Sequence, residues 1–113
     1  VYDGRYRYIV NLTPEATFQN VETKSPLFKE WKSLAETDSH AKAMTTKYQH
    51  RPAIELYDVK NDPYCMKNLA EDAKQASTIS RLDKELKRWM KDCGDEGQPT
   101  EMRAFEHMPG KRK

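Results

Sequence analysis

The sequence predicts an α+β fold, in which a small antiparallel sheet of three or four strands packs against one long C-terminal helix. Two observations indicate this class. Apolar and polar residues alternate over residues 5–12 (RYRYIVNL), whereas apolar residues recur every three or four positions over residues 72–93. A period of two is typical of a strand with one buried face, and a period near 3.6 is typical of an amphipathic helix. Two short helices are expected in the connection between the strands.

The first strand is expected to follow a tight turn. Asp3 and Gly4 stand directly before it, and this pair favours a two-residue hairpin because glycine tolerates a positive φ. Residues 1–2 would then end a preceding strand. A further strand is expected at residues 53–59, where the sequence Asn-Asp-Pro at 61–63 supplies the turn that stops it.

The connection between these strands contains two helix starts. Ser25 precedes a proline and suits the N-cap of a helix over residues 26–36. Asp38 can cap a second helix that runs to about Tyr48. This helix should end before Pro52, because the residue before a proline is pushed out of the helical region.

The long helix is expected over residues 72–93, with Gly94 as its C-terminal stop. Its apolar stripe requires a flat apolar partner, and the sheet is the natural one. The residues of the stripe are Ala76, Ile79, Leu82, Leu86, Trp89, Met90 and Cys93.

The chain after residue 95 is rich in glycine and proline, so residues 96–113 are expected to form an irregular or flexible tail. Three apolar residues, Met102, Phe105 and Met108, recur at helical spacing and offer an alternative in which the tail is pinned to a surface.

Charge and composition exclude two classes of partner. The 113 residues contain 20 Lys and Arg against 18 Asp and Glu, and the two signs are interspersed. A nucleic-acid footprint needs clustered positive charge, and the basic end at residues 111–113 is interpreted as a solvated tail. No apolar run is long enough to cross a bilayer. We therefore expect neither a nucleic acid nor a membrane as a partner.

The motifs of common catalytic and metal sites are missing. Cys65 and Cys93 have no zinc-ligand or CxxC spacing and are expected to be free thiols. The carboxylates of Asp58, Asp62 and Asp72 lack the EF-hand spacing and are interpreted as turn and cap residues. We therefore expect no metal site and no catalytic residue in this chain.

Several motifs resemble the C-terminal subdomain of sulfatases of the alkaline-phosphatase-like superfamily. The resemblance rests on ELYDVKNDP at residues 55–63, NLA at 68–70, and a long helix ending in RWM at 88–90. The upstream DGRYRYI at residues 3–9 is similar to a hairpin of the same family. One departure is Cys65 with its neighbour Met66, where an acidic residue is usual.

The segment NLTPEA at residues 11–16, with the helix start at Ser25, further resembles the heparan N-sulfatase (sulfamidase) branch. The resemblance covers residues 1–95 and implies a C-terminal subdomain that is a fragment of a larger enzyme, followed by the tail at 96–113. It implies an exported parent, in the periplasm, outside the cell or in a lysosome-like compartment.

The resemblance also implies a hydrolase of sulfate esters or sulfamates, with a formylglycine made in a C/S-x-P-x-R motif beside a calcium ion. This motif is absent here, so both groups are expected in an N-terminal catalytic domain of the same parent, and this chain alone is expected to be inactive. That domain is the implied partner, with a sulfated saccharide such as heparan sulfate as substrate.

In such enzymes the C-terminal subdomain borders the substrate cleft. The loop after the second short helix therefore suggests His50 and Arg51 as substrate-binding residues, because a guanidinium can pair with sulfate oxygens. Two alternatives stay open. The chain could be a carbohydrate- or protein-binding module that uses Tyr6, Tyr8 or Trp31 as a stacking platform, or a purely structural subdomain.

Overall fold

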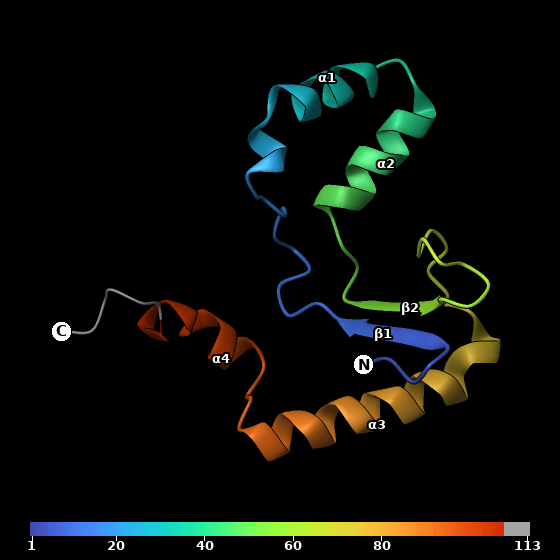
Figure 1. Cartoon of the computed structure of the whole chain (residues 1–113), viewed down its shortest axis with the longest axis vertical. Helices are drawn as coiled ribbons and strands as arrows, with labels where there is room; N and C mark the ends of the chain where they lie inside the picture. Colours follow the sequence, from blue (N-terminus) through green and yellow to red (C-terminus); the bar gives the residue numbers. More distant parts are fainter. Residues whose placement is uncertain (108–113) are drawn as a thin grey trace. The chain divides into compact units, whose positions relative to one another are not determined.

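The computed structural model describes residues 1–107 and confirms the α+β class (Figure 1). Residues 108–113, with Met108 and the basic end of the chain, lie outside the described part. The strands are β1 (Tyr6–Val10) and β2 (Ile54–Asp58), and the helices are α1 (Pro26–Leu34), α2 (Ser39–Gln49), α3 (Ala76–Cys93) and α4 (Gln98–Met102). Short 3-10 segments lie at Glu22–Lys24, Ala73–Gln75 and Ala104–His107.

The chain divides into two compact units. One contains residues 1–12 together with the chain from residue 53 onward, and the other contains residues 13–52. This division cuts across the predicted subdomain of residues 1–95, whose extent stays a prediction.

The sheet of the first unit is smaller than predicted. Within residues 1–107 it has two antiparallel strands, in a register that pairs Tyr8 with Leu56. The expected preceding strand is reduced to a bridge between Tyr2 and Arg7 and to a pair of 2.8 Å hydrogen bonds between the main chains of Val1 and Tyr8. The prediction of three or four strands was therefore too high.

The turn before β1 is wider than the predicted two-residue hairpin. Tyr2 pairs with Arg7, which leaves four residues between them. The Asp3 carboxylate accepts hydrogen bonds from the backbone N–H groups of Arg5 (3.0 Å) and Tyr6 (2.7 Å). These bonds replace strand pairing across the turn, and Gly4 takes the positive φ of 97° that the prediction required.

The outer edge of β2 is closed by a loop rather than by a further strand. The side chain of Asn68 accepts from Leu56 N–H (2.9 Å) and donates to the Ile54 carbonyl (3.2 Å). Leu69 N–H donates to the Leu56 carbonyl at 2.8 Å. Because Asn68 and Leu69 satisfy the edge groups of β2, no third strand is needed there.

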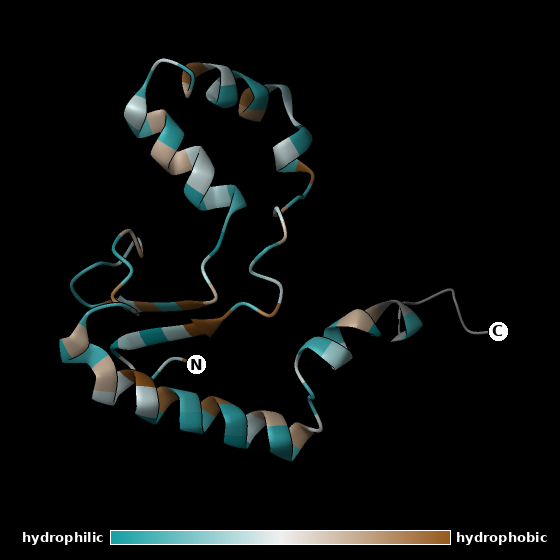
Figure 2. Cartoon of the chain, turned by 180° about the vertical axis from the view of Figure 1, so that it is seen from behind, coloured by the Kyte–Doolittle hydropathy of each residue, from teal (hydrophilic) through white to brown (hydrophobic). Residues whose placement is uncertain are grey.

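The core of the first unit lies between the sheet and α3. Tyr8, Leu56 and Leu82 are almost completely buried, and the Tyr8 hydroxyl donates to Asp83 of α3 at 3.2 Å. Figure 1 shows α3 running along the strands, and Figure 2 shows hydrophobic residues alternating with hydrophilic ones along this helix. The predicted packing of the long helix on the sheet is therefore confirmed. Partly buried residues around this core are Tyr6, Leu69, Ala70, Ile79 and Leu86.

The opposite face of β2 is buried as well, which the alternating pattern did not predict. Glu55 and Tyr57 lie there, and the Tyr57 hydroxyl donates to Glu55. Asn11 donates from its side-chain amide to Glu55 at 2.7 Å. Burial, followed by the bond to Glu55, raises the pKa of Tyr57. The polar atoms of this face are thus paired with one another.

The C-terminal part of this unit is more ordered than predicted. Gly94 ends α3 at a φ of 73°, as expected for a C-cap glycine. Residues 98–102 then form α4, so the expectation of an irregular tail fails for this stretch. Pro99 lies in the first turn of α4, where its missing N–H costs no hydrogen bond. Arg103 pairs with Glu96 across the helix.

The second unit contains the two short helices close to their predicted positions. The Ser25 hydroxyl accepts from Phe28 N–H at 3.1 Å, and the Asp38 carboxylate accepts from Ala41 N–H at 2.6 Å. Both residues therefore act as the N-caps that the sequence predicted. Phe28 is the buried apolar side chain at the centre of this unit.

None of the helices in the described part of the chain combines the length and the apolar character that a membrane span requires.

Candidate functional site

The two predicted site residues lie at the end of α2, in the second unit. His50 is the C-cap residue, and its backbone N–H donates to the Thr46 carbonyl at 2.8 Å. Both His50 and Arg51 are exposed. Both residues therefore lie on an accessible loop directly after a helix, and their role in binding substrate stays a prediction.

The Arg51 guanidinium lies over the ring of Phe18, with its Cζ atom 4.4 Å from the ring centroid. Phe18 is held near this loop because its N–H donates to the Gln49 carbonyl at 2.8 Å. Such a cation–π contact orients the guanidinium and leaves its N–H edge available. No Asp or Glu among residues 1–107 forms an ion pair with Arg51. The site can therefore accept an external anion.

Phe18 was missed as a member of this site. It lies 33 positions before Arg51, in a polar connection without periodicity. A contact of this kind depends on how the connection folds back onto α2, and no local signal in the sequence reports it.

An aromatic cluster continues from Phe18 into the helices of the second unit. The Phe18 and Tyr48 rings meet edge to face, with centroids 5.8 Å apart. Phe28 lies 5.6 Å from Tyr48 and 6.2 Å from Trp31. Asn20 donates to the Tyr48 hydroxyl at 3.0 Å. The cluster gives the two helices a common core and links it to the Arg51 loop.

A small groove of about 190 Å³ opens beside this cluster. Trp31 is 51% exposed there, so its indole is accessible to a ligand. The groove is lined by Glu22, Ser25, Leu27, Phe28, Trp31 and Tyr48.

The other residues suggested as stacking platforms are less suitable. Tyr8 is buried under α3, which rules it out as an exposed platform. Tyr6 is half-buried, and Arg5 covers its ring at 4.9 Å from the centroid. Both lie in the first unit, so Trp31 is the suggested aromatic that the structure leaves accessible.

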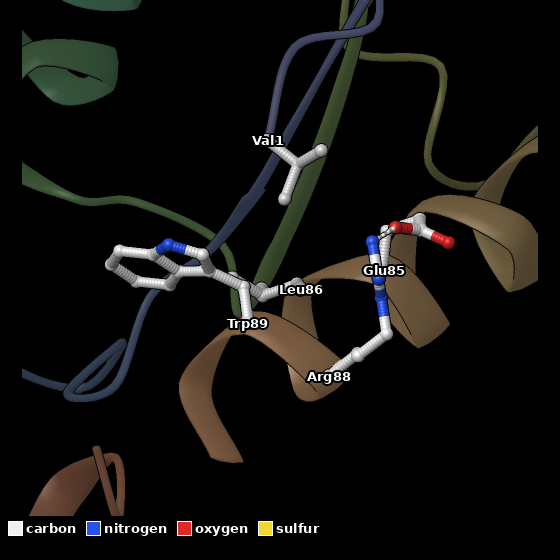
Figure 3. A pocket seen from close by; sticks show the side chains of 5 residues that line it. All are labelled: Val1, Glu85, Leu86, Arg88 and Trp89. Carbon is white, nitrogen blue, oxygen red and sulfur yellow. Dashed lines mark hydrogen bonds and ion pairs between the residues drawn. The ribbon is translucent and has the colours of Figure 1, made fainter. Parts of the chain in front are cut away.

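A second pocket, of about 430 Å³, lies in the first unit (Figure 3). Figure 3 shows the Trp89 indole on one side and the Glu85 and Arg88 side chains on the other, with Val1 and Leu86 between them. The two charged groups form an ion pair of 2.5 Å. They neutralise each other, so this pocket presents mainly apolar surface and no free catalytic group.

Asp58, Asp62 and Asp72 have the structural roles that the sequence predicted. Asp58 accepts from Arg5 at 2.7 Å and from the Asn61 side chain at 2.9 Å, and Arg5 lowers the pKa of Asp58. Asp62 accepts from Lys67 N–H at 2.8 Å. Asp72 caps the 3-10 turn before α3 by accepting from Lys74 N–H.

Neither cysteine forms a disulfide bond, as expected; Cys65 is half-buried and Cys93 is exposed. Cys65 has a positive φ of 53°, and Arg7 donates to its sulfur at 3.6 Å. Among residues 1–107, no three His, Cys, Asp or Glu side chains come together in a group that could hold a metal ion.

Comparison with known proteins finds similarity to sulfatases. An ulvan-active sulfatase of Formosa agariphila is 32% identical over 105 residues, which cover 89% of this chain and 18% of that protein. A second ulvan-active sulfatase of the same organism is 32% identical over 95 residues, which cover 84% of this chain and 17% of that protein. No protein-family model matches the chain.

These similarities support the sulfatase resemblance and do not support the sulfamidase branch. The chain spans less than a fifth of the length of the curated relatives it matches.

Proposed function

We propose that this chain is the C-terminal subdomain of a larger sulfatase and that residues 13–52 border the substrate cleft. Two features support this function. The similarity to sulfatases extends over most of the chain but over a small part of each relative. The Arg51 loop is exposed and carries a cation without a carboxylate partner among residues 1–107.

The sulfate-cleaving groups belong to another part of the parent in this proposal. A formylglycine requires a C/S-x-P-x-R motif, but neither Cys65 nor Cys93 has a proline two positions later. A calcium site requires several oxygen ligands, and no three His, Cys, Asp or Glu side chains come together among residues 1–107. We therefore place both groups outside this chain in the proposal and assign the chain no chemical step. Its role is to position the substrate.

The observation that carries the proposal is the orientation of Arg51 over Phe18 at 4.4 Å. A guanidinium fixed by an aromatic ring loses little conformational freedom when it pairs with sulfate oxygens. His50, next to it and exposed, is the second residue that we assign to the substrate.

The proposed substrate is a sulfated saccharide. The names of the relatives favour ulvan, whereas the NLTPEA motif favours the N-sulfate of heparan sulfate. We propose that the parent removes sulfate from one of them in an exported compartment, without binding nucleic acid or membrane. Oligosaccharides of both polymers, each with a desulfated counterpart, form a substrate panel that separates these possibilities.

The proposed contact between Arg51 and the substrate sulfate is tested by steady-state kinetics of the parent enzyme carrying Arg51→Ala. We expect KM for the sulfated substrate to rise about tenfold, because a charge-assisted hydrogen bond is lost, while kcat changes less than about twofold. Arg51→Lys should give an intermediate KM, since lysine keeps the charge but not the planar fork.

Lys29→Ala is the matched control, because it removes an exposed cation from α1 of the same unit. It should leave KM unchanged. An unchanged KM for Arg51→Ala, with normal thermal stability, would rule out the proposed contact.

A further inference from the structure

We propose that the groove beside Trp31 is a subsite for an uncharged sugar ring of the saccharide whose sulfate pairs with Arg51. This inference rests on the proposed function, because it takes the ligand to be a saccharide and takes Arg51 to be the residue that pairs with its sulfate. It adds a second contact to the one at Arg51, and it places Trp31, which the sequence suggested as one of three stacking platforms, in a defined groove with five further residues.

The size of the groove selects a small ligand. Its volume of about 190 Å³ lies below the roughly 300 Å³ at which pockets for drug-sized ligands begin. A helix or a folded partner would need a longer apolar surface. A single ring, continued by its neighbours outside the groove, suits this volume.

One side of the groove suits an apolar face of a pyranose ring. Trp31 presents its indole at one side, 51% exposed and packed on the buried Phe28. The negative face of an aromatic ring attracts the weakly positive C–H groups of a sugar. The indole is already positioned by its helix, so little entropy is lost on stacking.

The polar rim matches the hydroxyl groups of the same ring. The Ser25 hydroxyl accepts from Phe28 N–H, and the Tyr48 hydroxyl accepts from Asn20, so each retains an O–H that can donate to a ligand. Glu22 adds a carboxylate acceptor. Sugar hydroxyls donate and accept, so they can use both kinds of partner.

The charges of Glu22 and Arg51 favour different positions for the sulfate and for the uncharged sugar ring. Glu22 lines the groove and repels an anionic group there, whereas Arg51 attracts one. Arg51 and the groove are linked within one unit. The Arg51 guanidinium lies over the Phe18 ring, and the centroid of this ring lies 5.8 Å from that of Tyr48, which lines the groove. A saccharide can therefore direct its sulfate to Arg51 and an uncharged ring to Trp31.

The test measures binding by the complete 113-residue chain with isothermal titration calorimetry and NMR, using the sulfated and desulfated oligosaccharides of the panel. We expect Trp31→Ala to weaken binding of both forms about five- to tenfold. Arg51→Ala should weaken binding of the sulfated form alone. The control Leu34→Ala, at an exposed position of the same helix that does not line the groove, should change neither.

Trp31→Phe keeps an aromatic ring and should retain part of the affinity, which separates stacking from any loss of folding. The inference is overturned if Trp31→Ala behaves like Leu34→Ala, or if the wild-type chain binds neither form at millimolar concentration. Sulfate release by the parent is a separate measurement. A parent without activity but a chain that binds through Trp31 would refute the proposed function and leave this subsite as part of a binding module.

Discussion

Asp3 connects the turn before β1 to helix α3. Its carboxylate pairs with Arg81 and accepts from two backbone N–H groups of the turn. The bond from Arg81, followed by those from Tyr6 and Arg5, lowers the pKa of Asp3 from 3.8 to about 2. One short side chain thus joins segments 78 positions apart in the sequence.

Asp3→Asn should therefore destabilise the protein in a pH-dependent way. Because the folded pKa lies below the unfolded value of 3.8, the charged carboxylate stabilises the fold above about pH 4, and this contribution is lost as the pH falls toward 2. The difference in unfolding free energy between wild type and Asp3→Asn should shrink over this range in urea titrations.

Glu71→Gln is the control for Asp3→Asn, because Glu71 is an exposed carboxylate that forms no hydrogen bond within the described part of the chain. Its effect on stability should be small compared with that of Asp3→Asn, because no hydrogen bond is lost. A pH-independent effect of Asp3→Asn would show that the Asp3 charge does not contribute to folding.

Single residues with local roles could be predicted from the sequence, whereas those with distant partners could not. Ser25, Asp38 and Gly94 act on the helix directly beside them, so residue type and spacing were sufficient. Asn68 bonds to the edge of β2, 12 and 14 positions away, and its sequence position alone indicates no such role. The sequence position of Phe18 likewise gives no indication that its ring lies under Arg51.

Among the elements, α3 buries its apolar stripe to different extents along its length. Leu82 is 1% exposed in the core, and Ile79 and Leu86 pack around it. Trp89, on the same predicted stripe, is 62% exposed. The periodicity identified the helix and its direction of packing, but it could not show where the two-stranded sheet ends beneath it.

Leu82→Ala and Trp89→Ala should consequently differ in their effect on stability. We expect Leu82→Ala to lower the unfolding free energy by about 2–5 kcal/mol, because it leaves a cavity in the core. Trp89→Ala should change it by about 0.5 kcal/mol or less. Denaturant unfolding of the two variants checks this, and equal losses would mean that Trp89 is buried in solution.

Helices and strands were predicted well where a single hydrophobic period was clear. They were predicted less well where glycine and proline interrupt the sequence. The positions of α1, α2, β1 and β2 agree with prediction to within a few residues. Helix α4 was missed because Gly97 and Pro99 suggested irregular chain. Gly97 is buried beside Met90 and Leu12, and Pro99 occupies the one turn of a helix that tolerates it, so neither disrupts this segment.

In the molecule as a whole, the two units differ in the size of their cores and in the side chains that they expose. The first, built on β1, β2 and α3, contains the larger core, with Tyr8, Leu56 and Leu82 at its centre. The second presents the exposed Trp31 beside the buried Phe28, and the exposed Arg51 over the ring of Phe18. In the proposed parent, the first unit is the scaffold and the second meets the saccharide.

We propose that this chain is part of a sulfatase whose cleaving groups lie outside it. Sulfate release from the oligosaccharide panel tests this most directly, with the full-length parent and the 113-residue chain assayed side by side. We expect release by the parent and none by the chain. Release by the chain alone would refute this proposal, and so would a parent that releases no sulfate from any substrate of the panel.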